Sequence, residues 1–522
     1  MKNRYRAIVE TILIVILIVV IGAVWITASG NRAKNEEAEM LNQAKLVLYE
    51  GPKTLRDATA EDLAAAPETD RDFSLLHCTD TTVTVNGQDC YVYDTNVNHS
   101  RTWTNNYLPL ISRTPVTYFS FEGAVKIQVT VPDRTLDSVK ISPVSYGIEP
   151  QIDRENHTVT FVITEPDTYT LTFDGSPERA LHIFAYPPEE NTVDPEDENV
   201  IYIGPGEWNI ENIMLEDGDT LYVSGGAVVH GIINANYAKD ITVMGRGIID
   251  GSQFAGWKGV SASIPLKFDH CENVKISDLI VLNANAWVCQ AFDSQNGVID
   301  GIKIISPRPN GDGITLQSCQ NYEVKNCFVR SWDDSLVVKN YDGNSRNISF
   351  TNMQLWTDLA QSMEVGYETN KGEQPDAEMS DISFRNITVL NNFHKPVISV
   401  HNADDALVHD ITFENITVEN EEIGSGDGDE MPYLIDINIA QNTNWSSTKE
   451  RGQIQNITIK NVEVLSGREV QSRIKGFDAE HMVDGVTIEN LKILGKEITD
   501  FEEGDFLIDG QTTQNLSISY TK

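Results

Sequence analysis

The chain has few basic residues for its length. Its 522 residues include 39 Lys and Arg against 78 Asp and Glu, which gives a formal net charge of −39 at pH 7. Nucleic-acid binding needs clustered Lys and Arg at the phosphates, so this composition argues against such a partner. It argues more weakly against a polyanionic substrate, because an acidic protein can still carry a local basic groove. A simple role for the charge is solubility at a cell surface.

Cysteine is also scarce. Six cysteines in a chain of this length do not make a disulfide-stabilised scaffold. No pair has the CxxC spacing of a zinc site, and we expect neither a metal nor a cofactor. Cys78 and Cys90 flank a predicted hairpin that turns at Asn86-Gly87, so a disulfide between them is one alternative to separate structural thiols. The acidic loop Gly424–Glu430 lacks the full ligand series of a calcium loop, and we interpret it as a solvated insertion.

A long run without a charged residue extends from Thr11 to Ala28. Three basic residues precede it: Lys2, Arg4 and Arg6. With the apolar residues before it, the run approaches the roughly 20 residues that span a bilayer, whereas a cleavable signal peptide has an apolar core of about 7–15. We therefore predict that residues 1–30 form a single-pass anchor, with the N-terminus in the cytoplasm and the other domains outside the cell. Cleavage after Ala28, which would release a secreted protein, is the alternative.

Two regions precede the main repeat. Residues 31–72 are polar and are predicted to form a linker with a helix from Asn35 to Tyr49. Residues 73–190 alternate polar and apolar positions in segments such as TVTV, VKIQVTV, TVTFVIT and TYTLTFD. Short alternating strands separated by Gly, Pro and Asn turns indicate an antiparallel β-sandwich of about eight strands. Its polar faces contain no convergent His, Cys or carboxylate set, so we interpret it as an accessory domain.

From Asn199 onward, a short apolar strand followed by Gly or Asn recurs. Ten segments begin 20 to 46 residues apart: ITVMGRGII at Ile241, VKISDLIVL at Val274, IKIIS at Ile302, YEVKNCFV at Tyr322, ISFTNMQL at Ile348, ISFRNITV at Ile382, ITFENITV at Ile411, ITIKNVEV at Ile457, VTIENLKIL at Val486 and LSISY at Leu516. A minimum spacing near 20 residues with scattered insertions is typical of a β-helix, in which each coil adds one rung. We therefore predict that residues 191–522 form a right-handed parallel β-helix in an all-β protein. A leucine-rich repeat is excluded, because its regular Leu and Asn spacing is absent.

An asparagine recurs at the bend of six predicted coils. These residues are Asn326, Asn352, Asn386, Asn415, Asn461 and Asn490. The recurrence predicts an internal asparagine ladder. Several of the segments also spell N-x-[ST], which we interpret as part of the coil pattern rather than as glycosylation.

Three aspartates lie between Ser306 and Lys339. Asp312 belongs to the run NGDG, and the pair Asp333-Asp334 follows about one minimal coil later. Strands of successive coils stack about 4.8 Å apart, so we expect Asp312 and Asp333 at equivalent places on neighbouring coils. Carboxylates this close cannot all ionise without cost; at least one pKa rises, and that acid can protonate a leaving group while the others activate water. This arrangement predicts glycoside hydrolysis; an ordinary turn beside a polar loop is the alternative.

The NGDG run followed by the aspartate pair resembles two related families. These are the polygalacturonases of glycoside hydrolase family 28 and the dextranases and isopullulanases of family 49, which are inverting parallel β-helix hydrolases of the pectin-lyase-like fold. The predicted sandwich followed by VIYIGPGEWNI and LYVSGGAVVHGII is closer to family 49 in layout. The resemblance covers residues 130–370 and implies Asp333 as the general acid, with Asp312 and Asp334 as bases that position water. Stacked coils alone suggest a carboxylate separation of about 5 Å, typical of retention, so inversion requires these side chains to lean apart.

The chain departs from family 28 in the groups that would recognise a sugar acid. Family 28 carries Gly-His-Gly one coil after the aspartate pair and then Arg-Ile-Lys. Here the corresponding coil is QSMEVGYET, without His, and Arg473-Ile474-Lys475 lies far downstream, so we discount it. A galacturonate carboxylate would therefore lack its expected cationic partners. This favours a neutral α-linked glucan, such as dextran or pullulan, over pectin.

Further residues are candidates for substrate binding because of their positions near the aspartates. Six are predicted to line the cleft: Asn310, Lys339, Glu364, Tyr367, Trp287 and Trp332. Lys339 is also expected to steady Asp334. The two tryptophans, together with Trp356, are expected to stack on sugar faces, with packing between coils as the alternative. His394 and Lys395, two coils past the aspartate pair, are two additional candidates.

The sequence thus predicts an extracellular O-glycosidase that cleaves an α-linked polysaccharide with inversion. We expect a monomer whose only membrane contact is the N-terminal helix. Three alternatives remain open: a polygalacturonase-type pectin hydrolase, a polysaccharide lyase that abstracts a proton next to a uronate, and a non-catalytic glycan-binding β-helix.

Overall fold

The computed structural model describes residues 41, 43–63, 73–97, 112–190, 193–254, 263–422, 433–442 and 444–521. The predicted anchor at residues 1–30 and the loop Gly424–Glu430 lie outside these residues. Within the described part of the chain, no helix is long and apolar enough to cross a membrane. Strands dominate, and helical segments are short, as in α2 (Ala60–Leu63) and the 3-10 turn η1 (Val144–Tyr146).

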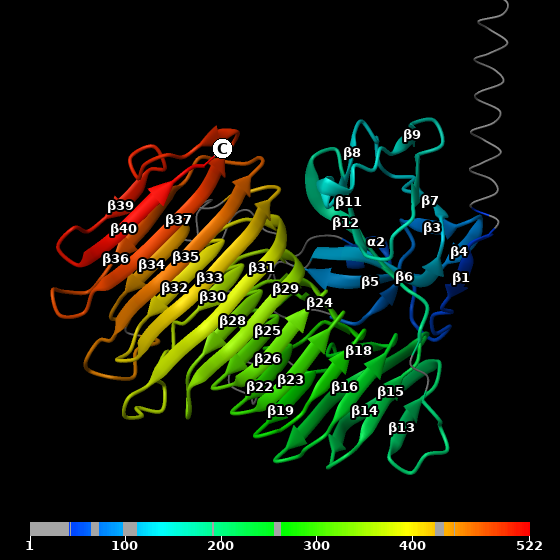
Figure 1. Ribbon diagram of the computed structural model, residues 1–522. Helices are drawn as coiled ribbons and strands as arrows, with labels where there is room; N and C mark the ends of the chain where they lie inside the picture. Colours follow the sequence, from blue (N-terminus) through cyan, green and yellow to red (C-terminus); the bar gives the residue numbers. More distant parts are fainter. Residues whose placement is uncertain are drawn as a thin grey trace, which may run out of the picture.

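Two sheets form the predicted sandwich, drawn in blue and cyan in Figure 1. The seven-stranded sheet comprises β1 (Lys45–Leu48), β2 (Leu76–His77), β5 (Val92–Val97), β6 (Ser112–Glu122), β8 (Val139–Ser142), β11 (Thr168–Phe173) and β12 (Ser176–Tyr186). The five-stranded sheet comprises β3 (Thr82–Val85), β4 (Gln88–Cys90), β7 (Val125–Thr130), β9 (Gln151–Asp153) and β10 (Thr158–Ile163). All pairings are antiparallel except that β12 runs parallel to β6. Apolar side chains of both sheets, including Phe121 and Phe161, meet in one core between them.

The sandwich begins earlier in the sequence than we predicted. Lys45–Leu48, which we assigned to a helix within a linker, forms strand β1 and pairs antiparallel with β6. The physical reason is its alternation at period two, since Leu46 and Leu48 turn toward the sandwich core while the residues between them face solvent. The cysteines also form no disulfide: Cys78 and Cys90 are separate buried thiols, as are the other four.

The 28 strands from Val200 to Ser519 form a parallel β-helix whose coils are each built from strands of three stacks. Stack 1 contains β13 (Val200–Ile203), β15 (Thr220–Val223), β17 (Thr242–Gly245), β20 (Lys275–Ser277), β23 (Gln295–Asp300), β26 (Gln320–Lys325) and β40 (Thr513–Ser519). Stack 2 contains β18 (Ile248–Asp250), β21 (Ile280–Leu282), β24 (Lys303–Ser306) and β27 (Phe328–Ser331). The right-handed sense of the coil stays a prediction.

Stack 3 carries the residues that matter below. It contains β19 (Leu266–Asp269), β22 (Cys289–Phe292), β25 (Ile314–Gln317), β28 (Leu336–Lys339), β30 (Met363–Val365), β32 (Ile398–Asn402), β34 (Tyr433–Ile439), β36 (Gln471–Lys475) and β39 (Phe506–Ile508). Two long strands bend from stack 2 into stack 3, β14 (Gly206–Leu215) and β16 (Ala227–Asn236). Five bend from stack 1 into stack 2: β29 (Ser345–Thr357), β31 (Glu378–Asn392), β33 (Leu407–Val418), β35 (Gln453–Val464) and β37 (Val483–Ile493), the last paired also with the short β38 (Lys496–Glu497).

Alternation along the stack 3 strands separates core from outer face. In β25, Ile314 and Leu316 belong to the core of the β-helix, and in β28 Leu336 and Val338 do the same. Because neighbouring side chains of a strand point to opposite faces, the residues between them face outward. The outer face of stack 3 is therefore lined by Thr315, Gln317 and Lys339 and their counterparts on other coils.

The sandwich packs against stack 2. Aromatic side chains of the seven-stranded sheet, such as Tyr93 and Phe184, share an apolar cluster with stack 2 residues such as Ile280, Phe328 and Trp356. Figure 1 shows the sandwich along the N-terminal half of the β-helix, near β15, β18 and β24. The turns that leave stack 2 lead directly into stack 3, and the aspartates lie in these turns. The sandwich therefore packs against the same coils that carry the aspartates.

The asparagine ladder is confirmed, but it is not internal. Each of the six asparagines has a positive φ, from 54° to 58°, a conformation that Asn tolerates better than most residues. Their side-chain amides donate from coil to coil, for example from Asn415 to Asn386 at 2.9 Å and from Asn461 to Asn415 at 2.8 Å. Five of these residues are exposed and Asn490 is partly exposed, because the bend between stacks 1 and 2 points them away from the core.

Candidate active site

The three aspartates lie in two successive turns from stack 2 into stack 3. Asp312 is in the turn between β24 and β25, and Asp333-Asp334 is in the turn between β27 and β28. In the ladder, Ile314 is opposite Leu336, and the N–H of Gly313 donates to the carbonyl of Asp334 at 2.8 Å. Asp312 is therefore opposite Asp334. The predicted equivalence of Asp312 with Asp333 is wrong by one residue, because the strand ladder and not the length of the turn sets the register.

Backbone groups fix the aspartate pair. The carboxylate of Asp333 accepts from the N–H of Asn310 at 2.9 Å and from the N–H of Asp334 at 3.1 Å. Asp334 accepts from the N–H of Gln361 on the following coil at 3.1 Å. Asp312 and Asp334 are buried, whereas Asp333 is partly exposed. Asn310 thus contacts the cluster through its main chain, which ties the two turns together.

One ammonium group sits among these carboxylates. The Nζ of Lys339 lies 3.5 Å from Oδ2 of Asp312 and 3.4 Å from Oε2 of Glu368. The hydroxyl of Tyr341 donates to the other carboxylate oxygen of Glu368 at 3.2 Å. The predicted role of Lys339 was to steady Asp334, but its nearest aspartate is Asp312. We did not predict Glu368 or Tyr341 from the sequence. Their positions were the available signal: Tyr341 follows the strand that ends at Lys339, and Glu368 follows the next stack 3 strand, each by a few residues.

The proton balance of this cluster suits acid/base chemistry. Burial raises the pKa of Asp312 to about 7, although Lys339 opposes the rise. Burial, reinforced by Asp333 and Asp312, raises the pKa of Asp334 well above its ordinary value. Burial also raises the pKa of Asp333, while Lys339, its two backbone donors and Lys395 hold it down. Because the pKa of Asp312 is about 7, this carboxyl group exchanges its proton near neutral pH beside two others whose pKa values are also raised, which is what general acid/base catalysis requires.

A row of alternating charges continues along stack 3 past the cluster. Glu364, Ser399, Asp436 and Arg473 occupy the same register position on four successive coils. Nδ1 of His401 lies 2.9 Å from Glu364, and its Nε2 lies 2.9 Å from Asp436. Arg473 in turn donates to both oxygens of Asp436 at 2.9 and 2.8 Å. Arg473, which we discounted as too far downstream, is therefore part of the same outer face.

Charge along this row is balanced inside the protein. Burial alone would lower the pKa of His401, but Glu364 and Asp436 raise it to about 9, so the imidazole is charged at neutral pH. The ring of Tyr367 stacks on that of His401 with centroids 4.3 Å apart. Glu364 is fully buried in this row, where its carboxylate accepts from Ser399 and lies beside His401. Its contact with substrate stays a prediction.

The tryptophans have different environments. Trp287 lies on the coil before the cluster, because the N–H of the next residue, Val288, donates across the coils to the carbonyl of Asp312 at 2.9 Å. Trp332 is 3% exposed and lies within the turn. Trp356 is buried against the sandwich, with His182 packed edge-on at 5.7 Å, so the predicted stacking of Trp356 on sugar is wrong. The outward-pointing side chains of stack 2, such as Phe328 and Trp356, face the sandwich and not the outer face of stack 3.

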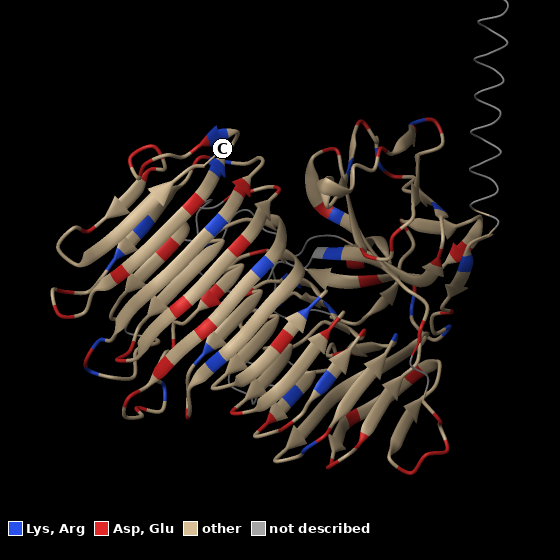
Figure 2. Ribbon diagram, viewed as in Figure 1, with Lys and Arg blue, Asp and Glu red and all other residues tan. Residues whose placement is uncertain are grey.

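Figure 2 shows basic residues interspersed with acidic ones along the strands in view, not gathered in one patch. Exposed pairs such as Lys492 with Glu463, at 2.7 Å, account for part of this pattern. On the outer face of stack 3, Lys339, His401 and Arg473 each lie within ion-pair distance of a carboxylate. A substrate carboxylate would have to compete with these internal partners.

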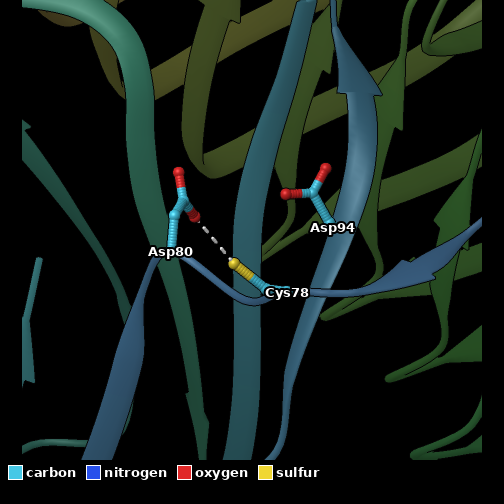
Figure 3. A group of neighbouring side chains, drawn as sticks. All are labelled: Cys78, Asp80 and Asp94. Carbon is cyan, nitrogen blue, oxygen red and sulfur yellow. Dashed lines mark hydrogen bonds between the residues drawn. The ribbon is translucent and has the colours of Figure 1, made fainter. Parts of the chain in front are cut away.

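One other group in the described residues has the spacing of metal ligands. Cys78, Asp80 and Asp94, shown in Figure 3, offer atoms within 4.8 Å of one another. Two guanidinium groups already neutralise the carboxylates. Nη1 of Arg179 lies 2.7 Å from Asp94, while its Nε donates to Asp80 at 3.0 Å. Nε of Arg113 lies 2.6 Å from Asp94. Burial raises the pKa of the Cys78 thiol, so it stays protonated. We interpret this group as an ion-pair network of the sandwich.

Sequence comparison finds relatives over part of the chain. The chain is 28% identical over 143 residues to a protein named "Probable polygalacturonase" from Vitis vinifera, which is 26% of this chain and 29% of that protein. It is 28% identical over 145 residues to a polygalacturonase from Brassica napus, which is 26% of this chain and 35% of that protein. The chain thus spans about a third of the length of these curated relatives.

Structure and family comparisons extend further along the chain. The fold is similar to that of Dex49A from Penicillium minioluteum, with a TM-score of 0.64 at 15% identity, covering 91% of this chain and 98% of that one. At this identity the likeness shows a shared fold and not a shared substrate. The family model described as "Glycosyl hydrolases family 28" matches residues 222–503, which is more than half of the chain. The predicted resemblance is thereby confirmed: the chain belongs to glycosyl hydrolases family 28.

Proposed function

We propose that the protein hydrolyses a neutral α-linked polysaccharide, a dextran- or pullulan-like glucan, with inversion. The observation that carries the proposal is that Asp312, Asp333 and Asp334 lie in two successive turns, where Lys339 pairs with Asp312 and acts electrostatically on all three. Hydrolysis of a glycosidic bond needs one protonated and one ionised carboxyl group on opposite sides of the bond. The cluster holds both forms near neutral pH.

The three aspartates have distinct proposed roles. Asp333, the most exposed of the three, protonates the leaving oxygen, and Asp312 and Asp334 position and deprotonate water. The proton of such a coupled group belongs to the group as a whole, so it is available to Asp333 when substrate displaces solvent there. Lys339 limits the number of protons by stabilising the ionised forms.

The preference for a neutral sugar rests on the internal pairing of the cations. Lys339, His401 and Arg473 already contact carboxylates of the protein, so each of these three positive charges on the outer face of stack 3 is paired with a negative charge. A uronate would add a negative charge to an already acidic site. Neutral hydroxyl groups, by contrast, can donate to the carboxylates and accept from the cations.

The second candidate is a pectin hydrolase. The names of the curated relatives favour it, since both are polygalacturonases. Lys395 also supports it, because this residue is close enough to lower the pKa of Asp333 and could meet a uronate carboxylate there. In either case we propose that the enzyme acts outside the cell, because the run from Thr11 to Ala28 has the length and flanking charge of a membrane anchor.

The test is a substrate screen of the purified full-length protein with two variants. Dextran, pullulan and polygalacturonate are compared by release of reducing ends, by the anomer that forms first in NMR spectra, and by ultraviolet absorbance, which reports the unsaturated product of a lyase. We expect glucan hydrolysis with inverted anomers, and a loss of about 10²–10⁴-fold in Asp333→Asn. The control Asp133→Asn changes an exposed carboxylate of the sandwich and should leave the rate unchanged.

Each outcome has a clear meaning. Activity confined to polygalacturonate transfers the assignment to the second candidate. Full activity in Asp333→Asn removes that residue from the chemistry. An ultraviolet-absorbing product identifies a lyase and overturns hydrolysis as the reaction.

A further inference from the structure

Four aromatic rings form a row beside the aspartate cluster, on the side of the N-terminal coils. They belong to Tyr237, His270, Phe292 and Tyr341. The ring centroids are 4.4 Å apart for Tyr237 and His270, 5.8 Å for His270 and Phe292, and 5.8 Å for Phe292 and Tyr341. Each ring comes from the end of a stack 3 strand or from the residues just after it. Figure 1 shows these strands, β16, β19, β22 and β28, following one another along the β-helix, with β25 between the last two.

The row leads directly into the aspartate cluster. The hydroxyl of Tyr341 bonds to Glu368, and Glu368 pairs with Lys339, the partner of Asp312. From β16 to β28 there are four steps between neighbouring strands, which corresponds to roughly 19 Å at the usual strand spacing. The row is therefore long enough to accompany several units of an extended polymer whose scissile bond lies at the aspartates.

These rings are accessible, unlike the aromatic stack inside the β-helix. Phe350, Phe384 and Phe413 also stack from coil to coil, at 4.8 and 4.9 Å, but all three are fully buried and belong to the core. In the row, Tyr237 is 73% exposed, and the other three side chains are partly exposed. Core packing therefore accounts for the phenylalanine stack but leaves the exposed row without a structural purpose.

Unpaired polar groups lie on the same face as the row. Gln290 shares β22 with Phe292 at a spacing of two residues, and Gln317 is opposite Phe292 in the ladder, so all three side chains face outward. The amide of Gln290 donates to Gln317, which leaves Oε1 of Gln290 and Nε2 of Gln317 buried without a hydrogen-bond partner. The hydroxyl of Thr315, which is opposite Gln290 in the ladder, is also unpaired.

An acceptor, a hydroxyl and a donor are thus unsatisfied beside the rings. A buried polar group destabilises the protein if it stays unpaired, so their grouping indicates a ligand or water that pairs with them. Sugar hydroxyls both donate and accept, and the apolar faces of sugar rings pack on aromatic faces. The combination matches a carbohydrate better than a peptide or a nucleotide, since the row contains no Lys or Arg and its imidazole, that of His270, already lies beside Asp269 and Asp293.

We propose that Tyr237, His270, Phe292 and Tyr341, with Gln290 and Gln317 beneath them, form a series of sugar-binding subsites. The series extends from the aspartates toward the N-terminal coils and holds one arm of the polysaccharide. It rests on the proposed glycoside hydrolase function of the same cleft. Binding energy from these remote units positions the scissile bond, so longer substrates gain in kcat/KM.

The test measures binding separately from hydrolysis. In the full-length Asp333→Asn protein, titration calorimetry with isomaltotetraose, maltotetraose and tetragalacturonate identifies the tetrasaccharide that binds. Phe292→Ala and Tyr237→Ala are then introduced in that background. The control is Tyr202→Ala, since Tyr202 is also exposed and stacked, on Tyr222 at 5.4 Å, but lies in stack 1. We expect each row variant to weaken binding about tenfold and the control to have no effect.

Two further readouts keep the outcomes distinct. In the active enzyme, both row variants should lower kcat/KM for the polymer more than for the disaccharide of the same linkage. Tyr237 is largely exposed, so Tyr237→Ala tests the row even if Phe292→Ala proves unstable on thermal unfolding. Unchanged binding in Tyr237→Ala, an equal loss in Tyr202→Ala, or no binding of any tetrasaccharide by the parent overturns the row as a sugar site. Retained binding by a protein that cleaves none of the polymers overturns the proposed function and leaves the row standing.

Discussion

The Nζ of Lys339 lies 3.5 Å from Oδ2 of Asp312, and the two residues belong to neighbouring coils of stack 3. Both side chains are buried, so their interaction is screened little by solvent. Burial would raise the pKa of Asp312 further than about 7 if the ammonium were absent. The number of protons in the aspartate cluster is thus set by a contact between coils.

Replacing Lys339 by Met should move the pH profile of kcat/KM to higher pH. Lys339 stabilises the ionised forms of Asp312, Asp333 and Asp334, so its loss raises their pKa values. The pH at which the cluster loses its last proton sets the alkaline limb of the profile, and this pH rises. The pH at which the base ionises sets the acidic limb, and it rises as well. Profiles recorded from pH 4 to pH 9 check this, with Lys492→Met as an exposed control. Two limbs that stay in place would show that the ammonium does not set the protonation of the cluster.

His401→Gln should destabilise the protein in a pH-dependent way. The folded-state pKa of His401, about 9, lies above the ordinary value of 6.5. The imidazolium therefore contributes stability that is fully present below pH 6.5 and is lost as pH rises through 9. At pH 6 the substitution leaves Glu364 and Asp436 buried without their shared cation, which costs about 3–5 kcal/mol.

Denaturant unfolding at pH 6 and pH 9.5 measures this difference. The gap between the parent and His401→Gln should shrink markedly at the higher pH. His481→Gln, which breaks a pair with the exposed Asp478, should leave the stability nearly unchanged at either pH. An equal loss at both pH values would mean that His401 acts as a neutral packing residue.

Arg330→Met should weaken the attachment of the sandwich. Arg330 is fully buried, donates to Asp358 at 3.3 and 3.4 Å, and lies 3.1 Å from Nε2 of His182 in the sandwich. Burial and the adjacent guanidinium hold the pKa of His182 well below its ordinary value, so its neutral ring accepts this bond. The substitution leaves Asp358 with a weaker set of partners, and we expect a loss of about 3–5 kcal/mol. Calorimetric unfolding should then show the sandwich and the β-helix melting separately; one unchanged transition would refute this coupling.

Asn415 separates the two contributions of the asparagine ladder. Its φ is 58°, and its amide donates to Asn386 and accepts from Asn461. Asn415→Gly loses the hydrogen bonds but keeps the backbone conformation without strain, whereas Asn415→Ala also incurs about 1–2 kcal/mol of left-handed strain. Chemical unfolding should therefore rank the proteins as parent, Gly variant and Ala variant. Equal stability of the two variants would assign the role of Asn415 to hydrogen bonding alone.

The sequence supports the fold prediction better than it supports the site prediction. Local alternation and the recurring Asn bend are short-range properties, and they were enough to predict a sandwich followed by a β-helix. Strand β1 escaped detection, because four alternating residues in an Ala- and Glu-rich stretch resemble a helix. The position of Asp312 opposite Asp334 was also not predicted. The turns before the two strands differ in length, so residues at the same ladder position are not equally far along their turns.

The sequence by itself determined that coils stack and that three aspartates fall in adjacent turns, because both follow from spacing along the chain. Only the tertiary structure decided which residues share a face. It placed Arg473 in the same register position as Glu364, three coils away, and it brought Tyr237 into one row with Tyr341 across more than a hundred residues. The physical reason is that insertions change the sequence distance between coils, while the backbone hydrogen bonds keep the spacing between neighbouring strands constant.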